Sequence, residues 1–166
     1  RTKHVRHSER LKNHIPGRLE LTIPGLPGTF SLLKFTPKDA SESLWSAYFS
    51  LSETIFQEFN PARRLPNRAT ARRLFSTANP LYIVKRWLLL GEMENAVAFA
   101  TLSYDTELSP DYESSSHLCH IQMEVAPALR RKKIATYLLK HMIETASVME
   151  KDTVRADADN PVGLQF

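Results

Sequence analysis

The fold of the chain is decided by the stretch VAPALRRKKIA, which runs from Val125 to Ala135. In front of it, residues 118–125 (LCHIQMEV) alternate apolar with polar side chains and predict a strand. Behind it, apolar side chains recur every four residues and predict a helix over about residues 130–150; they are Ile134, Leu138, Met142 and Ala146. The stretch is therefore the turn between a strand and a long amphipathic helix.

Four consecutive cations stand where this helix is expected to begin, and they are Arg130, Arg131, Lys132 and Lys133. Cations at a helix N-terminus interact unfavourably with the helix dipole, and each exposed cation lowers the stability of the helix by about 0.3–1 kcal/mol. The arrangement makes sense if an anion binds there, held by backbone N–H groups and basic side chains. A solvated charge run or a nuclear-targeting-like patch is the alternative. The position between a strand and a helix favours the anion site.

Further strands are predicted on both sides of this turn. Upstream, β-rich runs predict four strands, of which the last two form a hairpin, at residues 19–23, 30–35, 81–90 and 96–104. Residues 109–116 are polar and are expected to form an exposed loop. Downstream, residues 153–158 predict one more strand. Strands and helices are mixed along the chain, which predicts an α/β or α+β fold with one central sheet flanked by helices.

Two helices are predicted between the second and third strands. Thr36-Pro37 is expected to begin the first, whose apolar stripe spans residues 44–59, and Asn60-Pro61 to end it. Asn67 is expected to cap the second helix, over residues 68–77, with three arginines on its outer side, Arg68, Arg72 and Arg73.

The length of 166 residues fits one domain. The net charge, 22 − 18 = +4, comes from residues 1–20, which hold six basic and two acidic side chains, so the remainder is neutral. We therefore expect a basic, flexible arm over residues 1–18 and a folded domain over residues 19–166. Nucleic-acid binding is disfavoured, because a nucleic-acid domain carries its positive charge on the folded surface.

Composition excludes several other classes of protein. A single cysteine, Cys119, excludes a disulfide framework and a cysteine-based zinc module. No apolar run approaches the roughly 18 residues that a membrane span needs, and no apolar segment typical of a secretory signal is visible at the N-terminus. We expect a cytoplasmic protein without a membrane partner.

The turn resembles the acetyl-CoA signature of the GNAT (GCN-related N-acetyltransferase) superfamily, whose core pattern is Q/R-x-x-G-x-G/A. Arg130 stands at the first position of this pattern and Ala135 at the last, while Lys133 replaces the usual first glycine. Residues 153–158 and Asn160-Pro161 are similar to the family's fifth strand and to the start of its fourth helix. The resemblance covers about residues 29–166.

The resemblance implies a GNAT-like mixed sheet and acetyl-CoA as co-substrate. Backbone groups near the end of the signature strand would pair with the pantetheine arm and the acetyl carbonyl, and those of the loop and first helical turn would hold the pyrophosphate. Lys133 would either weaken the phosphate contact or add a cation to it. The implied acetyl-CoA-binding residues are Met123, Val125, Arg130, Arg131, Lys132, Lys133, Ile134, Ala135 and Asn160.

The resemblance also bears on how complete the domain is. The family fold has two further strands, and a tyrosine in its fourth helix often protonates the departing thiolate of CoA. These features would lie beyond Phe166. We therefore expect a domain truncated at its C-terminus, either a fragment or the N-terminal half of a tandem GNAT protein, with a second half or a second copy as partner.

Glu124 and His120 are the candidates for the general base, because period 2 places both on one face of the signature strand. Cys119 lies on the apolar face without a paired base and is not expected to be a nucleophile. No metal site is expected, since His117 and His120 fall on opposite faces of the strand.

The implied function is acetyl-CoA-dependent N-acetyl transfer, by direct attack, to a primary amine of a small molecule or peptide. The alternative is a non-catalytic acyl-CoA-binding or assembly module with the same fold, which Lys133 and the expected truncation would favour.

Overall fold

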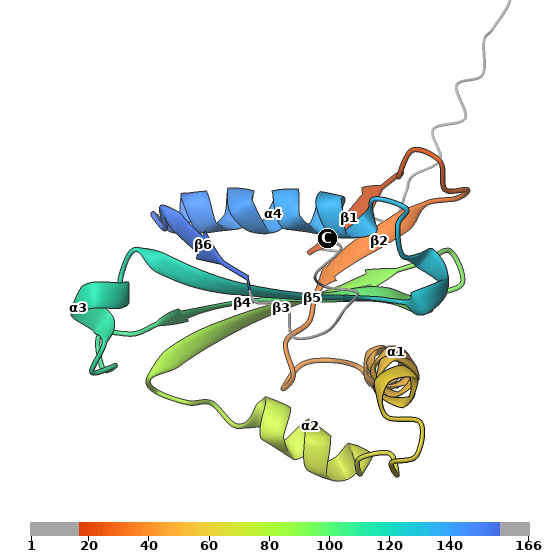
Figure 1. Cartoon of the computed structure of the whole chain (residues 1–166), viewed down its shortest axis with the longest axis horizontal. Helices are drawn as coiled ribbons and strands as arrows, with labels where there is room; N and C mark the ends of the chain where they lie inside the picture. Colours follow the sequence, from red (N-terminus) through yellow and green to blue (C-terminus); the bar gives the residue numbers. More distant parts are fainter. Residues whose placement is uncertain (1–16, 157–166) are drawn as a thin grey trace, which may run out of the picture.

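The computed structural model describes residues 17–156 and shows one six-stranded sheet with helices on both faces (Figure 1). Neighbouring strands pair antiparallel, except that β5 and β6 are parallel. The strands, in their order across the sheet, are β1 (Arg18–Leu21), β2 (Phe30–Lys34), β3 (Tyr82–Leu90), β4 (Ala96–Asp105), β5 (Leu118–Val125) and β6 (Thr153–Arg155). The helices are α1 (Glu42–Phe59), α2 (Arg68–Ser76), α3 (Tyr112–Ser115) and α4 (Ile134–Val148), with a 3-10 turn at Pro127–Leu129. The predicted α/β architecture with a central mixed sheet is confirmed.

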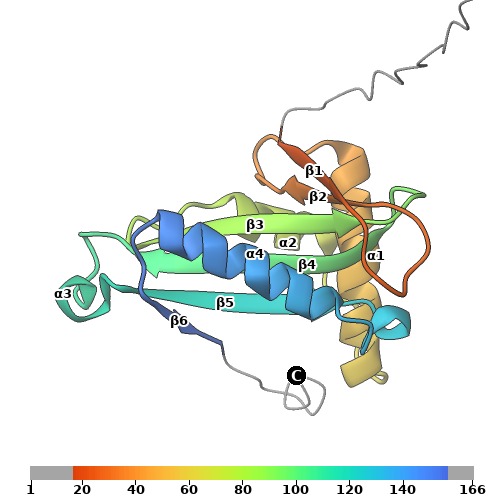
Figure 2. The same ribbon diagram turned by 90° about the horizontal axis from the view of Figure 1, so that it is seen from above.

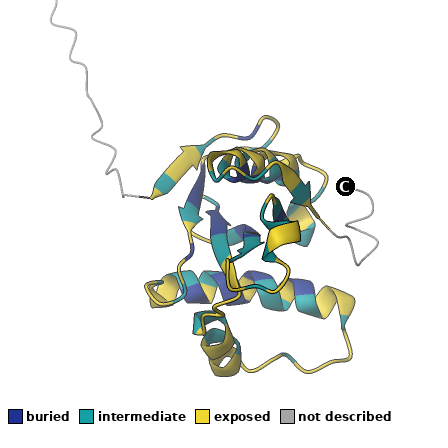
Figure 3. Cartoon of the chain, turned by 90° about the vertical axis from the view of Figure 1, so that its left-hand side faces the viewer, coloured by how far each residue is buried: buried dark blue, intermediate teal, exposed yellow. Residues whose placement is uncertain are grey.

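The sheet separates two hydrophobic cores (Figure 1; Figure 3). On one face, α4 covers the sheet with the stripe that its period predicted, Ile134, Leu138, Met142 and Ala146. On the other face, α1 packs an aromatic core against β3 and β4; its buried residues include Phe35, Trp45, Tyr48, Phe49 and Phe99. Alternate residues of each strand therefore face different helices, and this decides which side chains of β3 and β5 share a face.

The start of the first helix was predicted wrongly. Helix α1 begins at Glu42, where the Ser41 hydroxyl accepts a hydrogen bond from the backbone N–H of Leu44 at 3.2 Å. The carbonyl of Thr36 accepts hydrogen bonds from the backbone N–H groups of Asp39 and Ala40, so this segment forms a separate turn. The predicted end is confirmed, since Asn60 is the C-terminal cap.

Helix α2 begins at Arg68 with Asn67 as its cap, as predicted, and ends at Ser76. The outward orientation predicted for its arginines is wrong for two of them. Arg68 and Arg72 turn toward α1, where they form ion pairs with Glu53 and Glu42. These two ion pairs, together with the aromatic rings of α1 over which the two guanidinium groups lie, hold α2 against α1.

Two elements downstream also differ from the prediction. The segment expected to be an exposed loop over residues 109–116 contains the short helix α3, whose Ser114 and Ser115 hydroxyls both donate to the Asp111 carbonyl at 2.9 Å. In the predicted strand over residues 153–158, β6 covers Thr153–Arg155, and residues from 157 on lie outside the described part.

Strand β6 pairs with only the first half of β5. The parallel register joins Leu118 to Thr153 and His120 to Arg155, and β6 then runs away from β5 (Figure 2). On its other side, β5 pairs with β4 up to Val125. The last residues of β5 therefore lack a described strand partner on the β6 side.

Candidate functional site

The end of β5, the loop of residues 126–133 and the start of α4 form the centre of the candidate site. After the 3-10 turn, the backbone of Arg130 is extended, and Arg131 and Lys133 then adopt left-handed conformations with φ of 62° and 66°. A right-handed helix cannot include such residues. The prediction that a helix begins at the four cations is therefore wrong, since α4 begins at Ile134.

The N-terminus of α4 has no cap from the residue that precedes it. Lys133 occupies the N-cap position with φ of 66° and ψ of 10°, and its side chain makes no capping hydrogen bond. The first N–H groups of an α-helix have no partner within the helix and carry the positive end of its dipole. Together with the three exposed side chains of Arg131, Lys132 and Lys133, they make this loop suitable for an anion.

Arg130 plays a different part from the three cations that follow it. Its Nε donates to the carbonyl of Val125 at 3.1 Å, and its Nη1 forms an ion pair with Glu58 at 2.6 Å. Its guanidinium also lies 5.8 Å from the ring centroid of Phe59. With only 16% of its side chain exposed, Arg130 fastens the loop to the end of α1, a role that the sequence analysis missed.

The side chains of β5 divide between the two faces as predicted. Met123 and Val125 are half-buried and pack with the core under α4. Glu124 is exposed and His120 half-buried, on the face that carries α1. Four residues of strand separate them, which is about 13 Å along the backbone. Both candidate bases therefore share a face, but they lie at different ends of β5.

Tyr48 on α1 lies close enough to Glu124 for their charges to interact, and the sequence analysis did not identify it. Burial, followed by the charge of Glu124, raises the pKa of the Tyr48 phenol, while a hydrogen bond with Ser52 and the charge of Arg86 act in the opposite direction. The phenol therefore stays protonated at neutral pH and is a hydrogen-bond donor on this face.

Cys119 lies near the start of β5 and is fully buried. Burial raises the pKa of its thiol, so the reactive thiolate form is disfavoured. Among residues 17–156, no three side chains of histidine, cysteine, aspartate or glutamate come together as a metal-binding group. No helix in the same range is long and apolar enough to cross a bilayer.

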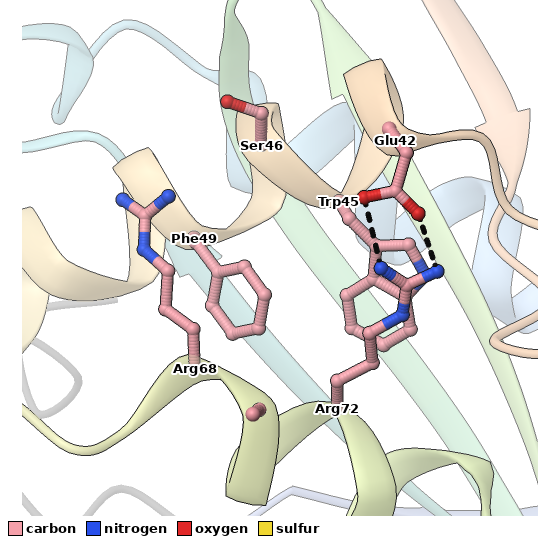
Figure 4. A pocket seen from close by; sticks show the side chains of 7 residues that line it. Glu42, Trp45, Ser46, Phe49, Arg68 and Arg72 are labelled. Carbon is pink, nitrogen blue, oxygen red and sulfur yellow. Dashed lines mark hydrogen bonds and ion pairs between the residues drawn. The ribbon is translucent and has the colours of Figure 1, made fainter.

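Two hollows on the described surface lie away from this loop. One, of about 310 Å³, lies between α1 and α2, where Arg72 sits 5.1 Å from the ring centroid of Trp45 and Arg68 sits 5.3 Å from that of Phe49 (Figure 4). The other, of about 450 Å³, lies beside β1 and the β3–β4 turn and is lined by Glu20, Glu92 and Glu94 among others. Neither contains a residue that the sequence singled out for chemistry.

Comparison with protein families matches residues 42–161 to the family described as Acetyltransferase (GNAT) family. A sequence comparison with curated proteins finds no match. The matched range includes α1, α2, the candidate loop and α4, and it also includes Asn160, which lies outside the described residues.

Solved structures with a similar fold come from several acetyltransferases. The aminoglycoside acetyltransferase meta-AAC0020 from an uncultured soil metagenomic sample, solved with sisomicin, matches with a TM-score of 0.59 and 15% identity over 82% of this chain and 84% of that one. A tandem GNAT protein from the clavulanic acid biosynthesis pathway matches with a TM-score of 0.59 and 17% identity over 78% of this chain and 36% of that one. The GNAT domain of S. lividans PAT matches with a TM-score of 0.55 and 21% identity over 84% and 77%.

Proposed function

Because the chain belongs to the GNAT acetyltransferase family, we propose that it transfers the acetyl group of acetyl-CoA to a primary amine. The observation that carries this proposal is the arrangement around Lys133. A left-handed turn there leads into the uncapped N-terminus of α4, directly beside the half of β5 that β6 does not cover. A thioester cofactor needs both parts, a site for its phosphates and an extended edge for its pantetheine arm.

The phosphates would be held by the loop. The N–H groups of Ile134 and Ala135 belong to the first turn of α4, and Arg131, Lys132 and Lys133 supply exposed positive charge beside them. Lys133 takes the left-handed conformation that glycine adopts most easily, so this replacement of glycine keeps the turn. Asn160 remains a predicted contact outside the described residues.

The acetyl group would lie along the end of β5. Backbone groups of Met123 and Val125 on the side away from β4 would bind the pantetheine arm, and a backbone N–H would stabilise the oxyanion. Arg130 would act indirectly, because its bond to the Val125 carbonyl and its ion pair with Glu58 hold the loop against the strand.

Glu124 is the better placed of the two candidate bases. It is the residue before Val125, whereas His120 is about 13 Å further back along the strand, where β6 is paired. Glu124 would accept a proton as the amine nitrogen attacks the thioester carbonyl. The new C–N bond forms, the C–S bond breaks, and the sulfur of CoA takes up one proton for the one that leaves the nitrogen.

The test compares Glu124→Gln with His120→Gln. Acetyl-CoA is offered with a panel of primary amines, free thiol is measured at several pH values, and CoA binding is measured by calorimetry. We expect Glu124→Gln to lower kcat about 100-fold, with the Kd for CoA changed less than twofold. Unchanged turnover in Glu124→Gln would move the base to His120 or to water.

A second pair of variants tests the phosphate site. Lys132→Gln in the loop should weaken CoA binding about two- to fivefold, the effect of one exposed charge. Lys140 is another exposed lysine, on α4, and Lys140→Gln should leave CoA binding unchanged, which makes it the matched control. Absence of CoA binding would refute the proposal. Binding without turnover of any amine would instead assign the chain to the non-catalytic acyl-CoA-binding alternative.

A further inference from the structure

Arg86 is a half-buried cation on the same face of the sheet as Glu124. On β3, it precedes Leu88 and Leu90, which both pack into the core under α1, so period 2 directs Arg86 to the α1 and α2 side as well. Its guanidinium confirms this orientation, since it lies 4.7 Å from the ring centroid of Phe75 on α2.

No described carboxylate pairs with this guanidinium. The ion pairs formed within residues 17–156 place Arg18, Arg68, Arg72 and Arg130 each against a glutamate, and Arg86 is in none of them. Burial lowers the pKa of Arg86, and the groups that act against this are the phenols of Tyr48 and Tyr82. A half-buried guanidinium has lost part of its hydration, and an anion would compensate that loss.

The register of the sheet places Arg86 close to the proposed reaction centre. Arg86 is opposite Thr101, which is opposite Gln122, and the next row is Leu88, Phe99 and Glu124. Arg86 and Glu124 are thus two strands apart and two residues apart along the strands, about 12 Å between backbones. Tyr48 lies within electrostatic range of both side chains. One face therefore presents a carboxylate at one point and a cation a short distance away.

We propose that Arg86 binds an anionic group of the acceptor, so that the substrate is a primary amine carrying a carboxylate or phosphate a few bonds from its nitrogen. This inference rests on the function proposed above and names its substrate class. The amine end of such a molecule faces Glu124, and its anionic end faces Arg86. A polycationic acceptor places positive charge against Arg86 instead, so the substrate differs in charge from the sisomicin named with the similar aminoglycoside acetyltransferase.

The test offers acceptors in matched pairs. ω-Aminocarboxylic acids with two to six carbons are compared with their amides, 2-aminoethyl phosphate is compared with ethanolamine, and sisomicin is the polycation. We expect kcat/KM for the acids to exceed that for the amides about 10- to 100-fold, which is the worth of one charged hydrogen-bond pair. The ω-amino acid with the highest kcat/KM reports the preferred spacing between amine and anion. The comparison of 2-aminoethyl phosphate with ethanolamine shows whether phosphate is preferred to carboxylate.

Variants then assign the preference to Arg86. Arg86→Gln should raise KM for the acids far more than KM for the amides, so that the preference for acids is lost, and Arg86→Lys should restore part of it. Lys85→Gln removes a cation from the opposite face of the same strand and should leave the preference intact. Binding of the N-acetylated acids and amides, measured by calorimetry with and without CoA, gives the same comparison independently of turnover.

The inference is wrong if amides or sisomicin are the better acceptors, or if Arg86→Gln lowers the values for acids and amides equally, as a purely structural residue would. It is also wrong if CoA binds but none of the carboxylate- or phosphate-bearing acceptors or their N-acetylated forms does. Failure of CoA itself to bind would identify the proposed function as the step that fails.

Discussion

Replacing Lys133 with glycine should stabilise the protein, although it removes a residue from the proposed cofactor loop. Lys133 has φ of 66°, and a left-handed conformation costs a residue with a Cβ roughly 1–2 kcal/mol. Glycine avoids this strain but gives up about 0.5–1 kcal/mol through the greater freedom of the unfolded chain. The free energy of unfolding should therefore rise by about 0.5–1 kcal/mol, which raises Tm by roughly 1–4 °C.

The matched control is Lys132→Gly, which removes the same charge one residue earlier, where φ is not positive. With no strain to relieve, this variant should lose about 0.5–1 kcal/mol. Urea unfolding of both variants at the same pH and ionic strength measures the difference, expected at about 1–2 kcal/mol in total. Equal destabilisation by the two substitutions would refute the argument that Lys133 is a strained substitute for glycine.

Three other predictions concern single side chains. Arg130→Gln should lower the free energy of unfolding by about 1–3 kcal/mol, because it removes a partly buried ion pair and the hydrogen bond to the Val125 carbonyl. Glu58→Gln removes only the ion pair and should lower the free energy of unfolding by less in the same urea titration. A larger decrease for Glu58→Gln would contradict the role of Arg130 in fastening the loop. Cys119, fully buried with a raised pKa, should resist thiol reagents at pH 8 until urea unfolds the chain, and rapid labelling of the native protein would show that β5 is open. Burial lowers the pKa of His141 from 6.5, so its neutral form favours the folded state; stability should fall as the pH drops below 6.5 toward the folded pKa, and His141→Gln should flatten this slope between pH 7 and pH 5.

Local patterns in the sequence predicted most elements of the fold. Asn67 marks the start of α2 because an asparagine side chain caps the adjacent N–H groups without help from distant residues. Thr36-Pro37 carries an equally good local signal for α1, but the cap of the helix lies five residues later, at Ser41. Which of the two caps is used depends on where α1 packs against the sheet. That is a property of the tertiary structure, which the local sequence does not contain.

The candidate site was predictable only in part. The alternation in β5 placed Glu124 and His120 on the correct face, since period 2 is a local property. Arg130 was grouped with its neighbouring cations because its partner Glu58 is 72 residues away along the chain. The sequence does mark Arg86 as unusual, because it is a cation on the same face as Leu88 and Leu90 within a β-rich run. Only the tertiary structure shows that it lies near Phe75 and on the same face as Glu124.

The strand order of the described sheet, β1 to β6, repeats the order in which the strands leave the ribosome. Each new strand therefore finds the edge of its predecessor already formed, and few pairings must wait for distant segments, which favours rapid folding. Two pairings are exceptions: β3 pairs with β2 only after α1 and α2, and β6 must cross over through α4 before it can pair in parallel with β5. We expect the gap between β5 and β6 to form last, so that the proposed acetyl-CoA site is complete only when the rest of the described sheet is folded.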